Sequence, residues 1–315
     1  FYGYYNQLAA SARRSQLLTG HNGFMECIKS GVVDFFRAPH AYAYRRPGLP
    51  GGIMSTFSSF TLRNTVVYNE NDERTVYGPS QGFQNDIYCG KPTSGLESIG
   101  QLNREFGVFA TTGIAQYWSD NPYGSLYEPA LTAALGQQLE AYAKLPAPRG
   151  LTPIEVAVVG DIESIYYSTD GQNGLYVAAI PGVFAKLNYL GVPFRNVVVT
   201  DLLDKGVAPA HKFYIMLPTL VLSKEQRQAL KERFDKENAT VLWLYAAGTS
   251  YPTAGPKGEF CGDFLGFTCV METSPRQETI AVPSQKVWSS KFTYAPHFYA
   301  TGGFDQVIAK NASDR

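Results

Sequence analysis

The segment at residues 65–75, TVVYNENDERT, constrains the fold of this chain more than any other stretch. It begins with a short apolar run rich in β-branched residues and then opens into a cluster of acids with one arginine. Such a run is typical of a strand buried in a parallel sheet, and the polar cluster indicates where that strand ends. In parallel α/β folds the reactive groups lie at the carboxyl ends of the strands. The first acid after the apolar run, Glu70, is therefore the leading candidate for a catalytic carboxylate.

The first half of the chain alternates segments of strand and helix character. Strands are expected at residues 1–5, 31–36, 65–69 and 113–120, and helices at 16–30, 94–111 and 126–145. The helix at 94–111 begins with a capping-box pattern, because Glu97 follows Ser94 by three residues. This alternation predicts an α/β fold whose four strands make about half of an eight-stranded barrel.

A Pro-rich segment at residues 146–150, PAPRG, indicates a linker to a second unit. Strands are expected there at residues 154–160, 196–201, 213–217 and 239–245, and helices at 174–190 and 224–237. Pro181 indicates that the helix at 174–190 either is kinked there or begins there. Ser223 is expected to cap the helix at 224–237. This pattern indicates a Rossmann-like or flavodoxin-like unit. The Gly-x-Gly-x-x-Gly fingerprint is absent, which disfavours a nucleotide site and a dehydrogenase. No cysteine follows the strand at 213–217, so we expect packing or assembly rather than amidotransferase chemistry.

Charge and cysteine content exclude several classes of function. Lys+Arg and Asp+Glu are both 27, so the net charge is zero and nothing predicts binding to nucleic acid or to an anionic membrane. No apolar run approaches the roughly 18–20 residues of a membrane-spanning helix. No CxxC occurs, and neither a metal nor another cofactor is expected. Cys261 and Cys269 either form a disulfide across a loop or remain two free thiols.

The chain begins abruptly with FYGYY, which resembles a strand already under way, and ends without an evident terminating element. We expect a processed chain or an internal piece of a longer polypeptide. The expected location is extracellular or periplasmic rather than cytoplasmic.

Residues 63–75, ending YNENDERT, resemble a segment of the β-galactosidase-like hydrolases related to glycoside hydrolase family 42. The neighbouring sequence agrees, since residues 33–42 (VDFFRAPHAY) resemble the preceding barrel strand and residues 118–120 (WSD) resemble the final one. Residues 151–250 are similar to the domain that follows the barrel in such proteins, a glutamine-amidotransferase-like sandwich associated with trimer formation. The resemblance covers nearly the whole chain, but none of its motifs is highly specific.

The resemblance implies a definite architecture and activity. Residues 1–148 would be the C-terminal half of a (β/α)8 TIM barrel, with residues 1–5 as about its fifth strand. Residues 149–315 would be a flavodoxin-like or glutamine-amidotransferase-like α/β domain of the trimerisation type. Glu70 takes the position of the nucleophile of a retaining β-galactosidase-like hydrolase, and the acid/base glutamate would lie upstream of Phe1. The implied partners are a carbohydrate substrate, further copies in a homotrimer and the missing half of the barrel.

Further acids and bases in the same segment leave alternatives open. Glu73 is a second candidate for the nucleophile. Arg74 is a candidate to keep Glu70 ionised, or it forms a structural ion pair with Asp72. The remaining possibility is that Glu70 is a solvated loop acid and the chain a non-catalytic carbohydrate-binding or assembly protein of the same fold.

Other strand ends supply candidate substrate contacts. Trp118 is either a platform on which a sugar stacks or a core residue at the barrel rim. Asp120 either accepts a hydrogen bond from a sugar hydroxyl or caps the next loop. His40, Tyr42 and Arg45 follow a strand end and are candidates to line the cleft, although a histidine there is more often a hydrogen-bonded structural group.

Overall fold

The structure is a computed structural model of the 315-residue chain. It describes residues 17–19, 35–53, 56–88, 90–120, 126–145, 153–166, 175–244, 247–248, 259–260, 268–272 and 306–310. The expected strand at 1–5, the linker at 146–150 and Cys261 lie outside these residues, as does most of the expected helix at 16–30.

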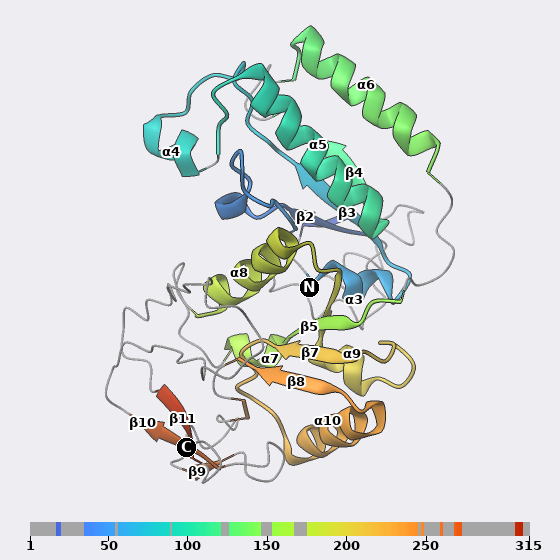
Figure 1. Cartoon of the computed structure of the whole chain (residues 1–315), viewed down its shortest axis with the longest axis vertical. Coiled ribbons are helices and arrows are strands. Elements are labelled where there is room, and N and C mark those ends of the chain that lie inside the picture. The colour runs from blue at the N-terminus through green and yellow to red at the C-terminus, as the bar shows by residue number, and fades with distance from the viewer. Residues whose placement is uncertain are drawn as a thin grey trace, which may run out of the picture.

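Four parallel strands form the first sheet, in the order β1-β2-β3-β4 (Figure 1). They are β1 (Leu17–Thr19), β2 (Phe35–Pro39), β3 (Val66–Asn71) and β4 (Ala115–Trp118). The prediction of helix from residue 16 is wrong at 17–19, which pair in parallel with the first three residues of β2. Pairing with a neighbouring strand outweighs the local preference there, because strand formation depends on tertiary context.

Among the described residues of the same part of the chain there are four helices and one helical turn. They are η2 (Tyr42–Tyr44), α3 (Phe57–Thr61), α4 (Phe83–Tyr88), α5 (Gly95–Thr112) and α6 (Pro129–Ala143). The predicted cap of α5 is confirmed, since the Ser94 hydroxyl accepts from the Glu97 backbone N–H at 3.2 Å. The Glu97 carboxylate, however, reaches back to the backbone N–H of Thr93 rather than to that of Ser94. The cap is therefore present, with its second hydrogen bond displaced by one residue.

The two faces of the first sheet differ in what covers them. Phe36 of β2 is fully buried and stacks on Phe60 of α3, with ring centroids 4.0 Å apart. Phe109 of α5 belongs to the same apolar cluster. Successive side chains of a strand point to opposite faces, so Arg37 and Glu70 occupy the other face, where both are partly exposed. Helices α3 and α5 therefore cover one face, and Glu70 stands on the opposite one.

A second parallel sheet has the strand order β6-β5-β7-β8. Its strands are β5 (Val156–Gly160), β6 (Phe194–Val198), β7 (Phe213–Met216) and β8 (Thr240–Trp243). Its helices are α7 (Ile162–Tyr166), α8 (Leu175–Leu190), α9 (Val199–Leu203) and α10 (Lys224–Glu237). Met216 packs with Leu230 of α10, whereas Ile215 packs with Phe184 of α8. Helices therefore lie on both faces of this sheet, and the predicted α/β class is confirmed.

Three boundaries in this part of the chain test the sequence reasoning. Helix α10 has the predicted limits, and Ser223 and Gln226 form a reciprocal capping box. The strand expected at 196–201 instead ends at Val198, because the Asp201 carboxylate accepts from the Val198 backbone N–H at 3.0 Å and starts α9. Helix α8 begins at Leu175, so Pro181 does not mark its start. Burial of the turn after Pro181, including Phe184 at 3% exposure, offsets the hydrogen bond that proline removes.

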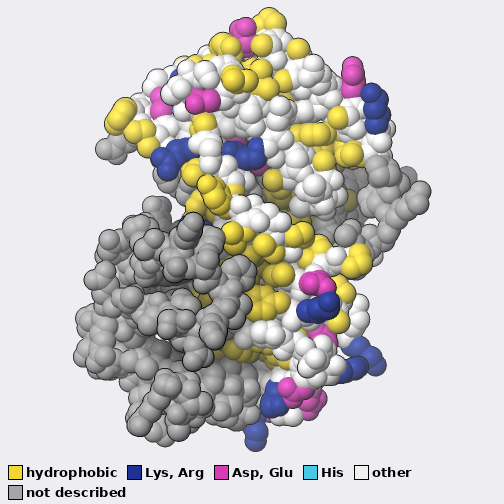
Figure 2. All heavy atoms as spheres, viewed as in Figure 1, with side chains coloured by type: hydrophobic (Ala, Val, Ile, Leu, Met, Phe, Trp, Pro, Cys, Tyr) yellow, Lys and Arg dark blue, Asp and Glu magenta, His cyan; other side chains and the backbone are white. Residues whose placement is uncertain are grey.

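Helix α3 joins the two sheets and lies between them (Figure 1). The backbone N–H of Ser58 donates to Asn196 Oδ1 at 2.9 Å, and the Ser59 hydroxyl donates to Asp201 at 2.5 Å. Arg63, just after α3, donates to Asp201 at 2.8 Å. Figure 2 shows hydrophobic side chains along this boundary. The junction therefore combines apolar packing with buried polar bonds.

Three short antiparallel strands complete the described structure. They are β9 (Glu259–Phe260), β10 (Thr268–Glu272) and β11 (Gln306–Lys310), in the order β11-β10-β9. Within the described part of the chain, none of the helices has both the length and the apolar character to cross a bilayer.

Candidate active site

Glu70 lies near the carboxyl end of β3, which has a strand on each side. Its register partners are Pro39 of β2 and Tyr117 of β4. The side chain is 21% exposed, so it is accessible yet held by its neighbours. The predicted strand thus presents Glu70 at the polar edge of a parallel sheet, on the face away from α3 and α5.

Two neighbours hold the Glu70 carboxylate. Arg37 Nε lies 3.5 Å from Glu70 Oε2, and Arg37 Nη1 donates to the Tyr117 hydroxyl at 2.7 Å. Burial, followed by the charge of Glu70 and a hydrogen bond to it, raises the pKa of Tyr117 to about 12. Tyr117 therefore keeps its proton and can donate to the carboxylate. The arrangement places a cation and a neutral phenol beside one carboxylate.

Sequence reasoning missed both of these neighbours. It assigned the neighbouring cation to Arg74, whereas the structure places Arg37 there. Arg74 acts elsewhere, contributing with Lys91 to the low pKa of Asp86, which is caused mainly by a hydrogen bond from Ser80. A usable signal was present, because Arg37 is two residues before the end of its strand and Glu70 one residue before the end of the next.

Tyr42 lies between Glu70 and a group of buried charged side chains that includes Asp72. Burial, then the charge of Asp72, raises the pKa of Tyr42 to about 12; the charge of Glu70 and a hydrogen bond with Asp72 add to the effect. The Arg45 guanidinium lies 4.3 Å from the centre of the Tyr42 ring, a separation suited to a cation–π contact. Tyr42 is half-buried, so among the predicted cleft residues it is one that a ligand could reach.

His40, immediately after β2, lies at the centre of that buried group. Its side chain is fully buried. Nδ1 is 3.2 Å from Glu105 Oε2 of α5, and Nε2 is 3.5 Å from Asp72 Oδ1 and 3.7 Å from Glu73 Oε1. The imidazole therefore has carboxylates facing both of its ring nitrogens.

Two arginines bind the same carboxylates. Arg104 of α5 donates to Glu73 Oε1 and to Glu105 Oε1, both at 2.8 Å. Arg45 Nη1 donates to Asp72 Oδ1 at 2.6 Å. The expected ion pair between Asp72 and Arg74 is thus replaced by one with Arg45, because the chain folds back after β2 and brings Arg45 beside the end of β3.

Burial dominates the electrostatics of this group. By itself burial lowers the pKa of His40, but the charges of Glu105 and Glu73 outweigh it, and the net pKa is raised. Burial raises the pKa of Glu73 to about 7 against the opposing charge of His40. For Glu105, burial is outweighed by the charge and hydrogen bond of His40 and by Arg104, so its pKa is lowered.

His40, Glu73 and Glu105 offer ligand atoms within 4.8 Å of one another, which is compact enough for one metal ion. Both carboxylates, however, already bind the guanidinium of Arg104. A divalent ion would have to displace that cation or sit beside it. We therefore describe the cluster as a buried ion network rather than a metal centre.

The low exposure of three of these side chains bears on the alternatives left by the sequence. Glu73 is 1% exposed and cannot reach a sugar, which argues against it as the nucleophile. His40 and Arg45 are 0% and 1% exposed, so they do not line an open cleft.

The two candidates after β4 take structural positions. Trp118 packs against the cluster of Leu102 and Leu131 under α5 and α6, on the face opposite Glu70. Asp120 accepts from the backbone N–H of Leu126 at 3.2 Å, as expected of a loop cap. Both placements favour support of the sheet edge over contact with a sugar.

Among known proteins, similarity to this chain was found by comparing structures and not by comparing sequences. No family model matches the chain, and no curated protein matches it. The crystal structure of a β-galactosidase from the psychrophilic Marinomonas ef1 is similar, with a TM-score of 0.53 and 12% identity over 88% of this chain and 48% of that one. The likeness shows that the two proteins share a fold. The resemblance to β-galactosidases is thus confirmed at the level of the fold.

Two further β-galactosidase structures match less extensively. A family 42 enzyme from G. stearothermophilus, solved as a catalytic mutant, has a TM-score of 0.42 and 16% identity over 70% of this chain and 39% of that one. The enzyme from Bifidobacterium adolescentis has a TM-score of 0.31 and 15% identity over 37% of this chain and 56% of that one. The chain spans about half the length of the structures it matches.

Proposed function

We propose that this chain carries the nucleophile of a retaining glycoside hydrolase that acts on β-linked galactosides, and that Glu70 is that nucleophile. The position of Glu70 carries the proposal. It is a partly exposed carboxylate at the carboxyl edge of a parallel sheet, next to Arg37 and Tyr117 on the face opposite α3 and α5. The β-galactosidase fold supports this choice of reaction.

In the proposed reaction the Glu70 carboxylate attacks the anomeric carbon as the bond to the leaving oxygen breaks. A second carboxylic acid, about 5–5.5 Å away, gives its proton to that oxygen. The resulting glycosyl ester is then cleaved by water, whose proton returns to the second carboxylate. Arg37 and Tyr117 hold the nucleophile in place before attack. Because Tyr117 keeps its proton, its hydroxyl can also donate a hydrogen bond to the carbonyl oxygen of Glu70 once the glycosyl ester has formed.

The architecture that fits this chemistry is the C-terminal half of a (β/α)8 barrel at residues 1–148, followed by a flavodoxin-like trimerisation domain at 149–315. The place of Glu70 near the carboxyl end of β3, on the face opposite α3 and α5, supports the first part, since barrel strands direct catalytic side chains inward from their carboxyl ends. The order β6-β5-β7-β8 supports the second. In this proposal the acid/base glutamate lies outside the chain and the protein assembles as a trimer.

A covalent trap tests the assignment directly. The full-length protein would be treated with a 2-deoxy-2-fluorogalactoside that carries a good leaving group, digested, and analysed by mass spectrometry. We expect the fluorosugar on the peptide that contains Glu70. Glu70→Gln should lose the label and the turnover of an aryl β-galactoside. Glu140→Gln, the same chemical change on the exposed face of α6, should keep both.

Azide provides a second test that separates the enzyme from a binding protein of the same fold. Azide should restore turnover to Glu70→Ala and yield the α-galactosyl azide, because it enters the space left by the missing carboxylate and displaces the β-linked leaving group with a single inversion. Labelling of another residue would move the nucleophile. Binding of galactosides by the wild type, with neither label nor turnover, would favour the non-catalytic alternative.

A further inference from the structure

The buried ion network around His40 contains six charged or titratable side chains, more than are needed to hold the His40 ring in place. Its members come from three places: His40 and Arg45 follow β2, Asp72 and Glu73 follow β3, and Glu105 and Arg104 lie on α5. The proposed mechanism uses none of them directly. Glu70, however, is two residues before Asp72, and its register partner Pro39 directly precedes His40.

The geometry at His40 determines how many protons its ring carries. A neutral imidazole has one N–H and one lone pair. Here Glu105 Oε2 faces Nδ1 at 3.2 Å, while Asp72 Oδ1 faces Nε2 at 3.5 Å. In a neutral ring one of these contacts would set a lone pair against a carboxylate in a site without solvent. Neither ring nitrogen meets hydrogen-bond geometry with these oxygens, so the contacts are ionic, and only an imidazolium places a polar N–H and positive charge on both sides.

The charge balance gives the same answer. Asp72, Glu73 and Glu105 contribute three negative charges, and Arg45 and Arg104 contribute two positive ones. One added proton brings the sum to zero, and the carboxylate oxygens at both ring nitrogens place it on His40 rather than on Glu73; a divalent metal ion with a neutral imidazole would leave an excess positive charge. Isolated charge is costly in the interior, so the proton is the better occupant.

We propose that His40 is a positioning residue that, as an imidazolium, ties the ends of β2 and β3 to α5 and thereby fixes Glu70. It acts through Asp72, which also binds Arg45 and bonds Tyr42. The inference rests on the proposed function only in taking Glu70 as the reactive group. It predicts that the end of β3 loosens as the pH rises and His40 loses its proton.

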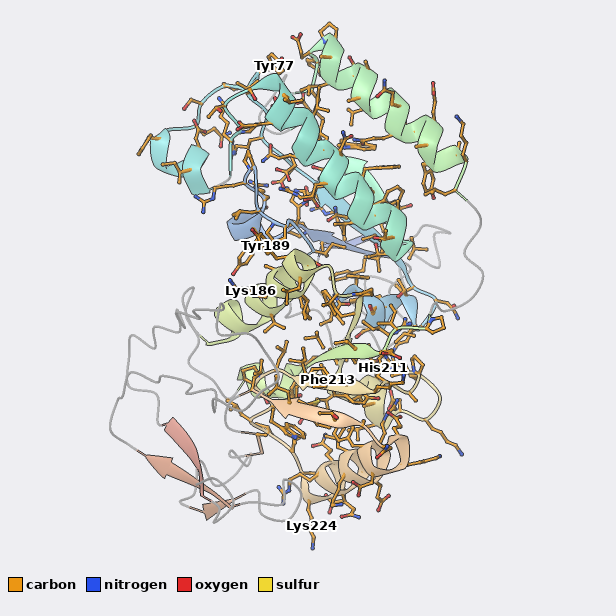
Figure 3. All side chains as sticks on the ribbon, in the orientation of Figure 1. Tyr77, Lys186, Tyr189, His211, Phe213 and Lys224 are labelled. Atoms are coloured by element: carbon orange, nitrogen blue, oxygen red, sulfur yellow. The ribbon has the colours of Figure 1, made fainter. Side chains whose placement is uncertain are left out.

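The same molecule provides an internal control. His211, two residues before β7 (Figure 3), is also buried, and its Nδ1 lies 2.8 Å from the carbonyl oxygen of Pro209. A carbonyl only accepts, so this contact requires a proton on Nδ1 and asks for none on Nε2. Burial lowers the pKa of His211. Two buried histidines are thus expected in opposite states.

Histidine-labelled protein separates these states by long-range 1H–15N NMR. At about pH 7 we expect both nitrogens of His40 to be protonated and His211 to be a neutral Nδ1–H tautomer. His40→Gln assigns the signal. A neutral His40 would overturn the inference. So would about one equivalent of bound divalent metal that is lost in Glu105→Gln.

Backbone hydrogen exchange measures how firmly the end of β3 is held, and it needs no turnover of substrate. Glu105→Gln removes one carboxylate facing His40, so the proton should be lost at lower pH than in the wild type. Protection of the peptide that contains Glu70 should fall by about tenfold or more, at the pH where the NMR signal changes, while the peptide over β7 stays protected. Equal loss in both peptides, or none in either, would refute the positioning role. The wild-type titration decides the charge if this variant fails to fold, and neither measurement depends on a sugar being cleaved.

Discussion

Replacing Asp201 by asparagine should weaken the junction between the two sheets far more than the same change at Asp204. Asp201 is fully buried. Its Oδ1 accepts from Arg63 Nη2 at 2.8 Å, and its Oδ2 accepts from Ser59 Oγ at 2.5 Å and from the Val198 backbone N–H at 3.0 Å. Donors therefore face both carboxylate oxygens. An asparagine amide would have to set its NH2 against one of these groups in either orientation.

The expected loss follows from this arrangement. Each hydrogen bond to a charged group contributes about 1.5–3 kcal/mol, and at least two of those at Asp201 are lost in Asp201→Asn. Breaking a buried ion pair typically costs about 3–5 kcal/mol; Arg63 keeps Asp204 as a partner, so here the lost hydrogen bonds of the buried Asp201 account for most of the loss. We expect the free energy of unfolding to fall by about 3–5 kcal/mol.

Urea unfolding monitored by circular dichroism measures the change, with Asp204→Asn as the matched control. Asp204 binds the same guanidinium at 2.9 Å, but its side chain is 34% exposed. Loss of an exposed pair costs about 1 kcal/mol or less. If the two variants lose equal free energy, burial of the Arg63–Asp201 pair is not what stabilises the junction.

Two further predictions concern single side chains. Tyr117→Phe removes the hydroxyl beside Glu70, and kcat/KM for an aryl β-galactoside should fall about 10- to 150-fold, since a hydrogen bond to a charged group contributes about 1.5–3 kcal/mol. The control Tyr77→Phe, in the exposed loop after β3 (Figure 3), should leave kcat/KM unchanged. Equal activities of the two variants would remove Tyr117 from the site. Burial raises the pKa of Asp161 from 3.8 to about 6, so the unfolded chain loses this proton first and wild-type stability should fall by about 3 kcal/mol as the pH rises through that interval. Asp161→Asn should abolish this fall in urea unfolding, and parallel curves for the two proteins would contradict the assignment.

Local patterns in the sequence were sufficient where neighbouring residues supply the stabilising contacts. The limits of α10 follow from its caps, because Ser223 and Gln226 are close in sequence and bond each other. The strand with Glu70 was equally predictable, since its apolar run and polar end adjoin. By contrast, residues 17–19 form a strand only because β2 lies beside them, and Asp201 leaves the expected strand to start a helix.

The α/β class, the strand that carries Glu70 and the place of Glu70 at a polar sheet edge all follow from local sequence patterns. Tertiary structure decided which groups surround that carboxylate. Arg37 and Tyr117 are 80 residues apart and meet only through the register of β2, β3 and β4. Arg45 rather than the adjacent Arg74 binds Asp72. The physical reason is that charge interactions depend on distance and burial in space, and neither is contained in the spacing of residues along the chain.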